Sequence, residues 1–129
     1  MRERRKQERK SLVAYTQVYD IYGGFLIGYL GDLSAQGAMV ITEKSMESGQ
    51  EITLGIEVPE LPNIKATRMS LAARVAWCEP DISPQFFNVG FEFKQVTSQQ
   101  MSLIQTIIAN YEFRRDAPNY PPRPDGQRP

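Results

Sequence analysis

Two short motifs contain the residues whose types and spacing could do chemistry. Arg5 and Arg9 form R-x-x-x-R within "RRKQER", residues 4–9, and no other arginine pair in the chain has this spacing. Asp32, Ser34 and Gly37 form D-x-S-x-x-G within "DLSAQG", residues 32–37. Arginine is a planar cation that pairs with phosphate oxygens or base edges, whereas a carboxylate accepts from N–H donors. The combination indicates binding of a ligand with both kinds of group.

Each motif also has a simpler interpretation. "RRKQER" could be a solvated leader that keeps the chain soluble. "DLSAQG" could be a turn in which Asp32 and Ser34 cap backbone amides and Gly37 adopts a left-handed conformation. Neither motif by itself decides between the structural and the functional interpretation.

The composition narrows the chemistry that is available. The chain has 129 residues, no histidine and one cysteine, Cys78. Without histidine there is no Ser/His or Cys/His nucleophile pair, and the usual zinc ligands are missing. We therefore expect neither an enzyme nor a metal or cofactor site. A single cysteine, no apolar run of membrane-spanning length and no signal-like segment predict a cytoplasmic protein without a membrane span.

Charge is distributed unevenly, although the formal net charge is zero. Residues 1–10 carry six basic and two acidic side chains, and residues 114–129 carry four basic and two acidic ones. Residues 11–113 carry five basic and eleven acidic side chains. A basic arm on an acidic body can rest on that body unless a more anionic ligand recruits it.

Short β segments must position the two motifs. Alternation and turn residues predict strands over 11–21, 25–31, 38–42, 51–58, 68–78 and 86–93, with a hairpin turn at "YGG", residues 22–24. Met101, Ile104, Ile108 and Tyr111 mark one face of a helix over about 98–113, and Thr97 with Gln100 predicts a capping box. These elements favour a small barrel or sandwich. We expect a flexible basic arm over 1–10, one domain over 11–113 and a disordered Pro-rich tail over 114–129.

The order of the two motifs, followed by "ARVAWCEPDISPQFFNVGFEF" and a helix, resembles the PilZ domain, the bacterial receptor module for cyclic di-GMP. The resemblance covers roughly residues 4–113. It implies a six-stranded antiparallel PilZ-type β-barrel with a C-terminal α-helix. It also implies that Arg5 and Arg9 clamp guanine and phosphate, that Asp32 accepts from guanine N–H groups, that Ser34 adds a hydroxyl contact, and that Gly37 lets the backbone come close.

Two further positions stay open. In PilZ-like domains a basic residue at the Arg4 position can help to hold a second ligand molecule. Trp77 could be a stacking platform for a base. Alternation in 68–78, however, puts Trp77 on the inward face with Met69, Leu71, Ala73 and Val75, which is the core interpretation.

The resemblance implies a receptor or adaptor that works as a switch. Cyclic di-GMP would order the arginine arm against the barrel and create a surface for a partner protein, in motility, biofilm or virulence processes. One alternative is a nucleic-acid-binding β-barrel, which the acidic body disfavours. Another is a PilZ-like adaptor that acts through protein contacts without nucleotide. The sequence leaves the partner, the number of bound ligands and the oligomeric state open.

Overall fold

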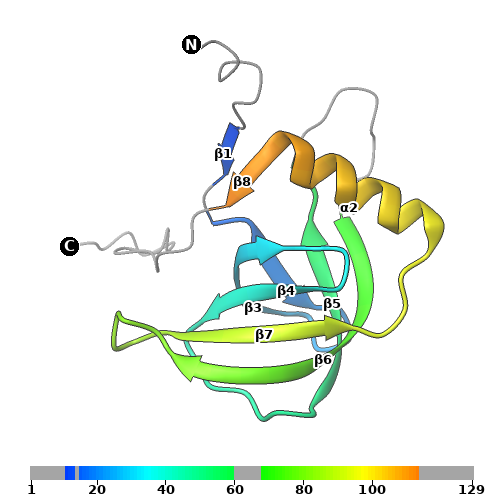
Figure 1. Cartoon of the computed structure of the whole chain (residues 1–129). Helices are drawn as coiled ribbons and strands as arrows, with labels where there is room; N and C mark the ends of the chain where they lie inside the picture. Colours follow the sequence, from blue (N-terminus) through cyan, green and yellow to red (C-terminus); the bar gives the residue numbers. More distant parts are fainter. Residues whose placement is uncertain (1–10, 14, 60–67, 114–129) are drawn as a thin grey trace, which may run out of the picture.

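Six antiparallel strands close into a barrel in the computed structural model, which describes residues 11–13, 15–59 and 68–113 (Figure 1). Around the barrel the order is β2-β3-β4-β7-β6-β5. The strands are β2 (Gln17–Asp20), β3 (Phe25–Leu33), β4 (Gly37–Thr42), β5 (Glu51–Glu57), β6 (Arg68–Pro80) and β7 (Phe87–Phe93). The predicted fold class is confirmed. The proposed division into arm, barrel and tail stays a prediction, because residues 1–10 and 114–129 lie outside the described residues.

Alternation along the strands fills the barrel interior. On β6 the side chains of Met69, Leu71, Ala73 and Val75 are at most 3% exposed, while Arg68, Ser70 and Arg74 between them are exposed. The same core takes one face each of the other strands, including Val18, Leu30, Val40, Leu54, Ile56, Val89 and Phe91. Burial of this apolar surface is the main favourable term in folding.

The helix α2 (Ser98–Asn110) lies across one end of the barrel (Figure 1). It begins at the predicted capping box: Gln100 N–H donates to Thr97 Oγ1 at 3.1 Å, and Thr97 N–H donates to Gln100 Oε1 at 3.0 Å. Ile104 and Ile107 are the helix residues that enter the core. The predicted end at Phe113 is wrong, because Tyr111–Phe113 is the short strand β8.

The first predicted strand, 11–21, is divided in two. β1 (Ser11–Val13) pairs in parallel with β8, with Ser11 opposite Tyr111, and only β2 joins the barrel. Tyr15, between them, has φ of 63°, which is unfavourable for a bulky side chain. Its ring packs edge-on against Tyr29 at 5.6 Å between centroids. The start of β1 is therefore held beside the end of α2 and not in the barrel wall.

The second predicted strand is longer than expected. β3 continues through Asp32 and Leu33, because Leu33 pairs with Ala38 of β4. Only residues 34–36 form the connection between the two strands. The D-x-S-x-x-G motif thus begins in one strand and ends at the first residue of the next.

Candidate functional site

Trp77 lies on the outside of the barrel. The pairing of β6 with β7 shifts in register between Val75 and Trp77, and such a bulge reverses the in–out alternation of a strand. Val75 is 1% exposed, whereas Trp77 is 42% exposed. The prediction that groups Trp77 with the inward residues is therefore wrong, because simple alternation does not include the extra residue, Ala76.

A glycine supports the Trp77 ring. Gly90 lies opposite Trp77 on β7, and a Cβ at Gly90 would be 2.2 Å from Trp77 Cε2 and 2.3 Å from Nε1. The indole therefore packs directly on the β7 backbone, which is possible only where the partner residue has no side chain. Trp77 is a fixed aromatic surface on the outer wall of the barrel, with a large part of it open to solvent.

A second bulge turns Asp32 outward. The pairing of β3 with β4 shifts in register between Leu30 and Asp32, so that Leu30 and Leu33 are both buried while Asp32 is exposed. Gly31, the residue between, is buried, and a Cβ there would lie 2.7 Å from Met39 Cε. Asp32 Oδ1 accepts a hydrogen bond from the Leu33 N–H at 3.0 Å. The bulge thus keeps the carboxylate out of the core and at the surface.

Ser34 holds the connection after β3 together. Its Oγ accepts from the N–H groups of Gln36 and Gly37, both at 3.2 Å. The acceptors within reach of its own hydroxyl proton, Gly37 O and Gln36 Oε1, lie 3.4 and 3.5 Å away, at the long limit of hydrogen bonding. Ser34 therefore has the predicted turn role, and its proton can be redirected to a stronger acceptor.

Gly37 is needed for strand packing and not for a left-handed turn. It is not among the described residues with positive φ, so the left-handed conformation expected for the turn interpretation is wrong. A Cβ at this position would lie 2.1 Å from the carbonyl oxygen of Phe91 on β7. Glycine is required here because β4 and β7 approach closely.

The outward residues meet in one open pocket of about 390 Å³, which we call the outer pocket. It is lined by Asp32, Leu33, Ser34, Gln36, Gly37, Ala38, Met39, Ala76, Trp77, Gly90, Phe91 and Glu92. Asp32 also lines a neighbouring pocket of about 350 Å³ with Tyr111–Phe113 of β8. Four of the predicted site residues, Asp32, Ser34, Gly37 and Trp77, are thus brought together. Arg4, Arg5 and Arg9 lie outside the described residues.

Charged side chains alternate next to the outer pocket. Arg74 on β6 forms an ion pair with Glu92 on β7, and Lys94 Nζ lies 2.8 Å from Glu51 Oε1 on β5. The hydrogen bond to Glu92 raises the pKa of Arg74, and the hydrogen bond from Lys94 lowers the pKa of the Glu51 carboxyl. Sequence reasoning missed Glu92 as a pocket residue, although its two-residue spacing from Gly90 on β7 places both on the outer face.

A comparison with protein-family models gives one match, the PilZ domain, over residues 3–110. The chain belongs to the PilZ domain family. The match includes both motifs, all six barrel strands and α2 to its last residue. This is a family of cyclic di-GMP-binding and adaptor domains. No curated protein and no solved structure matches the chain.

Two further properties of this PilZ domain concern membranes and metals. Within the described residues, no helix combines the length and the apolar character that crossing a bilayer requires. In the same residues, no group of three or more His, Cys, Asp and Glu side chains could hold a metal ion.

Proposed function

We propose that this PilZ domain binds cyclic di-GMP through Arg5, Arg9, Asp32, Ser34 and Gly37, with Trp77 as a base-stacking surface. The observation that carries the proposal is the outer pocket, where two independent bulges bring Asp32 and Trp77 to the same surface beside Ser34. A solubility leader or an isolated turn requires no such arrangement. A cyclic dinucleotide does, because it presents two bases to stack and two phosphates to neutralise.

The position of β1 makes the arginines available to this pocket. Ser11 is paired with Tyr111, and Tyr111 lines the neighbouring pocket that shares Asp32. Arg9 precedes Ser11 by two residues, and an extended chain spans at most about 3.3–3.6 Å per residue, so its Cα is within about 7 Å of Ser11. The same limit for Arg5 is about 20 Å. These limits are compatible with the proposed contacts of both arginines at the end of the barrel where Asp32 and Tyr111 lie.

Ligand binding would order the arm and form a surface for a partner protein. Ordering a residue costs roughly 1–2 kcal/mol in backbone entropy, and a hydrogen bond to a charged group returns about 1.5–3 kcal/mol. A few arginine contacts can therefore order about residues 4–10, with Arg4 as a third basic contact. Motility, biofilm formation and virulence are the processes that the family suggests, with a cytoplasmic location.

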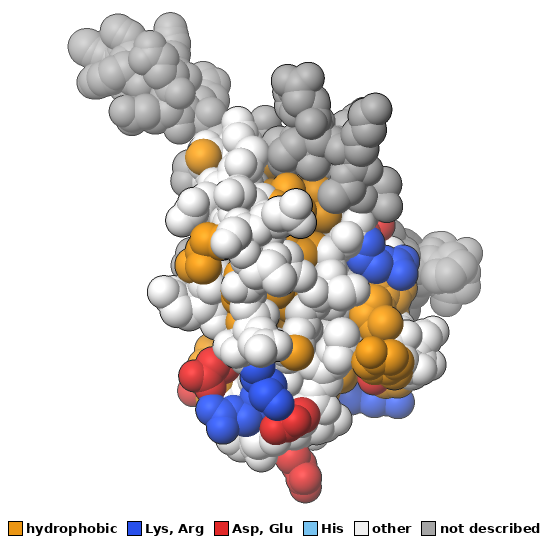
Figure 2. Space-filling model, turned by 90° about the vertical axis from the view of Figure 1, so that its right-hand side faces the viewer, with side chains coloured by type: hydrophobic (Ala, Val, Ile, Leu, Met, Phe, Trp, Pro, Cys, Tyr) orange, Lys and Arg blue, Asp and Glu red, His pale blue; other side chains and the backbone are white. Residues whose placement is uncertain are grey.

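The charge of the barrel disfavours the nucleic-acid alternative. On the face that Figure 2 shows, basic and acidic side chains lie next to one another near the lower edge and form no basic stripe. Arg74 and Lys94 are both occupied by carboxylates. A protein that tracks a phosphate backbone needs a continuous basic surface.

Titration with cyclic di-GMP tests the proposal. Trp77 is the only tryptophan of the chain, so its fluorescence reports directly on stacking in the outer pocket. We expect quenching by cyclic di-GMP, with an affinity that falls at least about 10-fold in Arg5→Ala and in Arg9→Ala, since each removes a charge-assisted contact. Arg2→Ala, a change of the same charge in the same arm, should bind like the unchanged protein. Trp77→Ala should lose about 1–3 kcal/mol of binding, measured by calorimetry.

Two controls separate the alternatives. GTP should not compete at equal concentration, and an oligonucleotide should bind only weakly and with steep salt dependence. Binding of the oligonucleotide without binding of cyclic di-GMP would reject the proposal in favour of a nucleic-acid barrel. Absence of heat with either ligand would favour an adaptor that acts through protein contacts alone.

A further inference from the structure

We propose that Glu92 and Arg74 form a base-reading pair, which selects guanine over adenine at the base that stacks on Trp77. The inference rests on the proposed function and extends it to two residues that belong to neither motif. Glu92 lines the outer pocket together with Trp77 and Gly90. Arg74 reaches Glu92 from the neighbouring strand.

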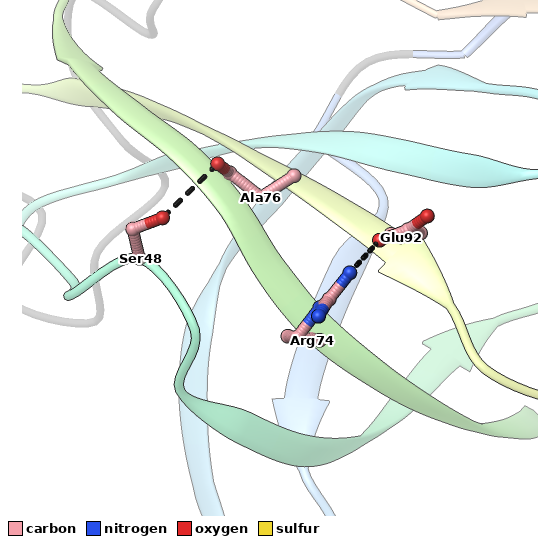
Figure 3. A network of polar contacts seen from close by, with 4 residues as sticks. All are labelled: Ser48, Arg74, Ala76 and Glu92. Carbon is pink, nitrogen blue, oxygen red and sulfur yellow. Dashed lines mark hydrogen bonds and ion pairs between the residues drawn. The ribbon is translucent and has the colours of Figure 1, made fainter.

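The base-reading pair and the stacking surface, Trp77 on Gly90, occupy adjacent positions on β6 and β7. Gly90 lies opposite Trp77, and Glu92 lies opposite Arg74. Gly90 and Glu92 are two residues apart on β7, which is about 6.6 Å along a strand and on one face. Figure 3 shows Arg74 crossing from β6 toward Glu92. A base that stacks on the indole therefore has its edge within reach of the pair.

The chemistry of the pair matches one base. Guanine presents two neighbouring donors, at N1 and N2, followed by an acceptor at O6. A carboxylate accepts both donors, and a guanidinium fork held against that carboxylate can donate to O6. Adenine has an acceptor at N1 and a donor at N6, so it would leave one carboxylate oxygen facing a lone pair. Such a mismatch is how a polar site rejects a similar ligand.

Arg74 also makes a carboxylate tolerable beside a ligand with two phosphates. An isolated Glu92 would repel the anion, but the ion pair neutralises it. The Arg74 guanidinium is charged at neutral pH, as arginine side chains are in proteins. Arg74 thus contributes to affinity by neutralising Glu92, and Glu92 contributes to the choice of base.

The loop of residues 48–50 fixes the spacing between Arg74 and Trp77 on β6. Gly49 N–H donates to Val75 O at 2.7 Å, Val75 N–H donates to Gln50 O at 2.8 Å, and Ser48 Oγ–H donates to Ala76 O at 3.2 Å (Figure 3). These bonds hold β6 between Arg74 and Trp77, at the bulge. Gly49 has φ of 92°, which favours glycine. Ser48 and Gly49 are therefore positioning residues for the base-reading pair.

The test compares two charge-equivalent variants, Glu92→Gln and Glu51→Gln. Both remove one partly exposed carboxylate beside Arg74, but only Glu92 lines the outer pocket. Cyclic di-GMP and cyclic di-AMP are titrated against each variant, with Trp77 fluorescence as the readout. We expect the preference for the guanine ligand to fall about 10-fold or more in Glu92→Gln, the scale of a lost bidentate base contact, and to be unchanged in Glu51→Gln.

Two arginine variants complete the test. Arg74→Ala should weaken binding of both ligands, because Glu92 is then an unpaired negative charge, and Arg74→Lys should restore most of the affinity. If Glu92→Gln and Glu51→Gln have the same ligand preference while binding still depends on Arg5 and Arg9, the base-reading pair is rejected and the proposed function stands. If the unchanged protein binds neither cyclic dinucleotide, both proposals are rejected together.

Discussion

The two halves of β6, before and after the bulge at Ala76, differ in strand pairing and in side-chain alternation. From Arg68 to Val75 the strand pairs with β5 as far as Arg74 and with β7 from Ala73 onward, and its side chains alternate between the core and the outer surface. Beyond Arg74 it has no β5 partner, because Arg74 pairs with Glu51, the first residue of β5, and after the bulge its exposed residues include Trp77 and Glu79. The regular half supplies the core, and the irregular half supplies the outer pocket.

The same contrast occurs in β3. Residues 28–30 follow a regular ladder with β4, and the shift at Gly31 then turns Asp32 to the surface. In both strands, one inserted residue separates a core segment from a site residue. Bulges re-aim side chains without disturbing the barrel behind them, which allows a binding site to be built on a closed wall.

The largest loss of stability is expected from a substitution in the core-forming half of β6, residues 68–75. Leu71→Ala removes a fully buried side chain, 1% exposed, and should lower the free energy of unfolding by about 2–5 kcal/mol. Chemical denaturation measures this loss. Trp77→Ala is the comparison: because the ring lies outside the core, it should cost clearly less stability than Leu71→Ala. An equal or larger loss for Trp77→Ala would mean that the two halves of β6 do not differ as described.

A smaller loss of stability is expected from adding a side chain at Gly90, beneath the Trp77 indole. Gly90→Ala places a Cβ about 2.2 Å from the indole, so the ring must move away from β7. Overpacking of this kind costs typically about 1–3 kcal/mol. We expect a shifted Trp77 emission spectrum and weaker cyclic di-GMP binding with the barrel still folded, as judged by circular dichroism. An unchanged emission spectrum would contradict the packing of Trp77 on Gly90.

The smallest effect is expected from the charges beside the pocket. Lys94 lowers the pKa of Glu51 in the folded state, so the pair slightly stabilises the protein at neutral pH, and that contribution is lost in acid as pH falls through the lowered folded-state pKa. Glu51→Gln should therefore leave the melting temperature nearly unchanged at pH 7 and flatten its decline only in acid. Because both side chains are largely exposed, a large loss of stability at pH 7 would be contrary to expectation.

Much of the fold could be predicted from the sequence because its signals are local. Alternation identified all the barrel strands, "YGG" identified the hairpin turn, where Gly24 has φ of 73°, and Thr97 with Gln100 identified the start of α2. The order of the two polar motifs was sufficient to indicate the PilZ family. Each of these signals depends on residues that are close together in the sequence, and hydrophobic periodicity and local propensity can be recognised over such short segments.

Only the tertiary structure decided which face the site residues occupy. The bulges at Gly31 and Ala76 depend on how β4 and β7 pair with their neighbours, and no local pattern records an inserted residue. The end of α2 at Asn110 likewise depends on pairing of β8 with β1, about one hundred residues away in the sequence. The sequence by itself determined the elements and the motif chemistry. Long-range strand register placed Asp32, Trp77 and Glu92 on one outer surface, around the same pocket.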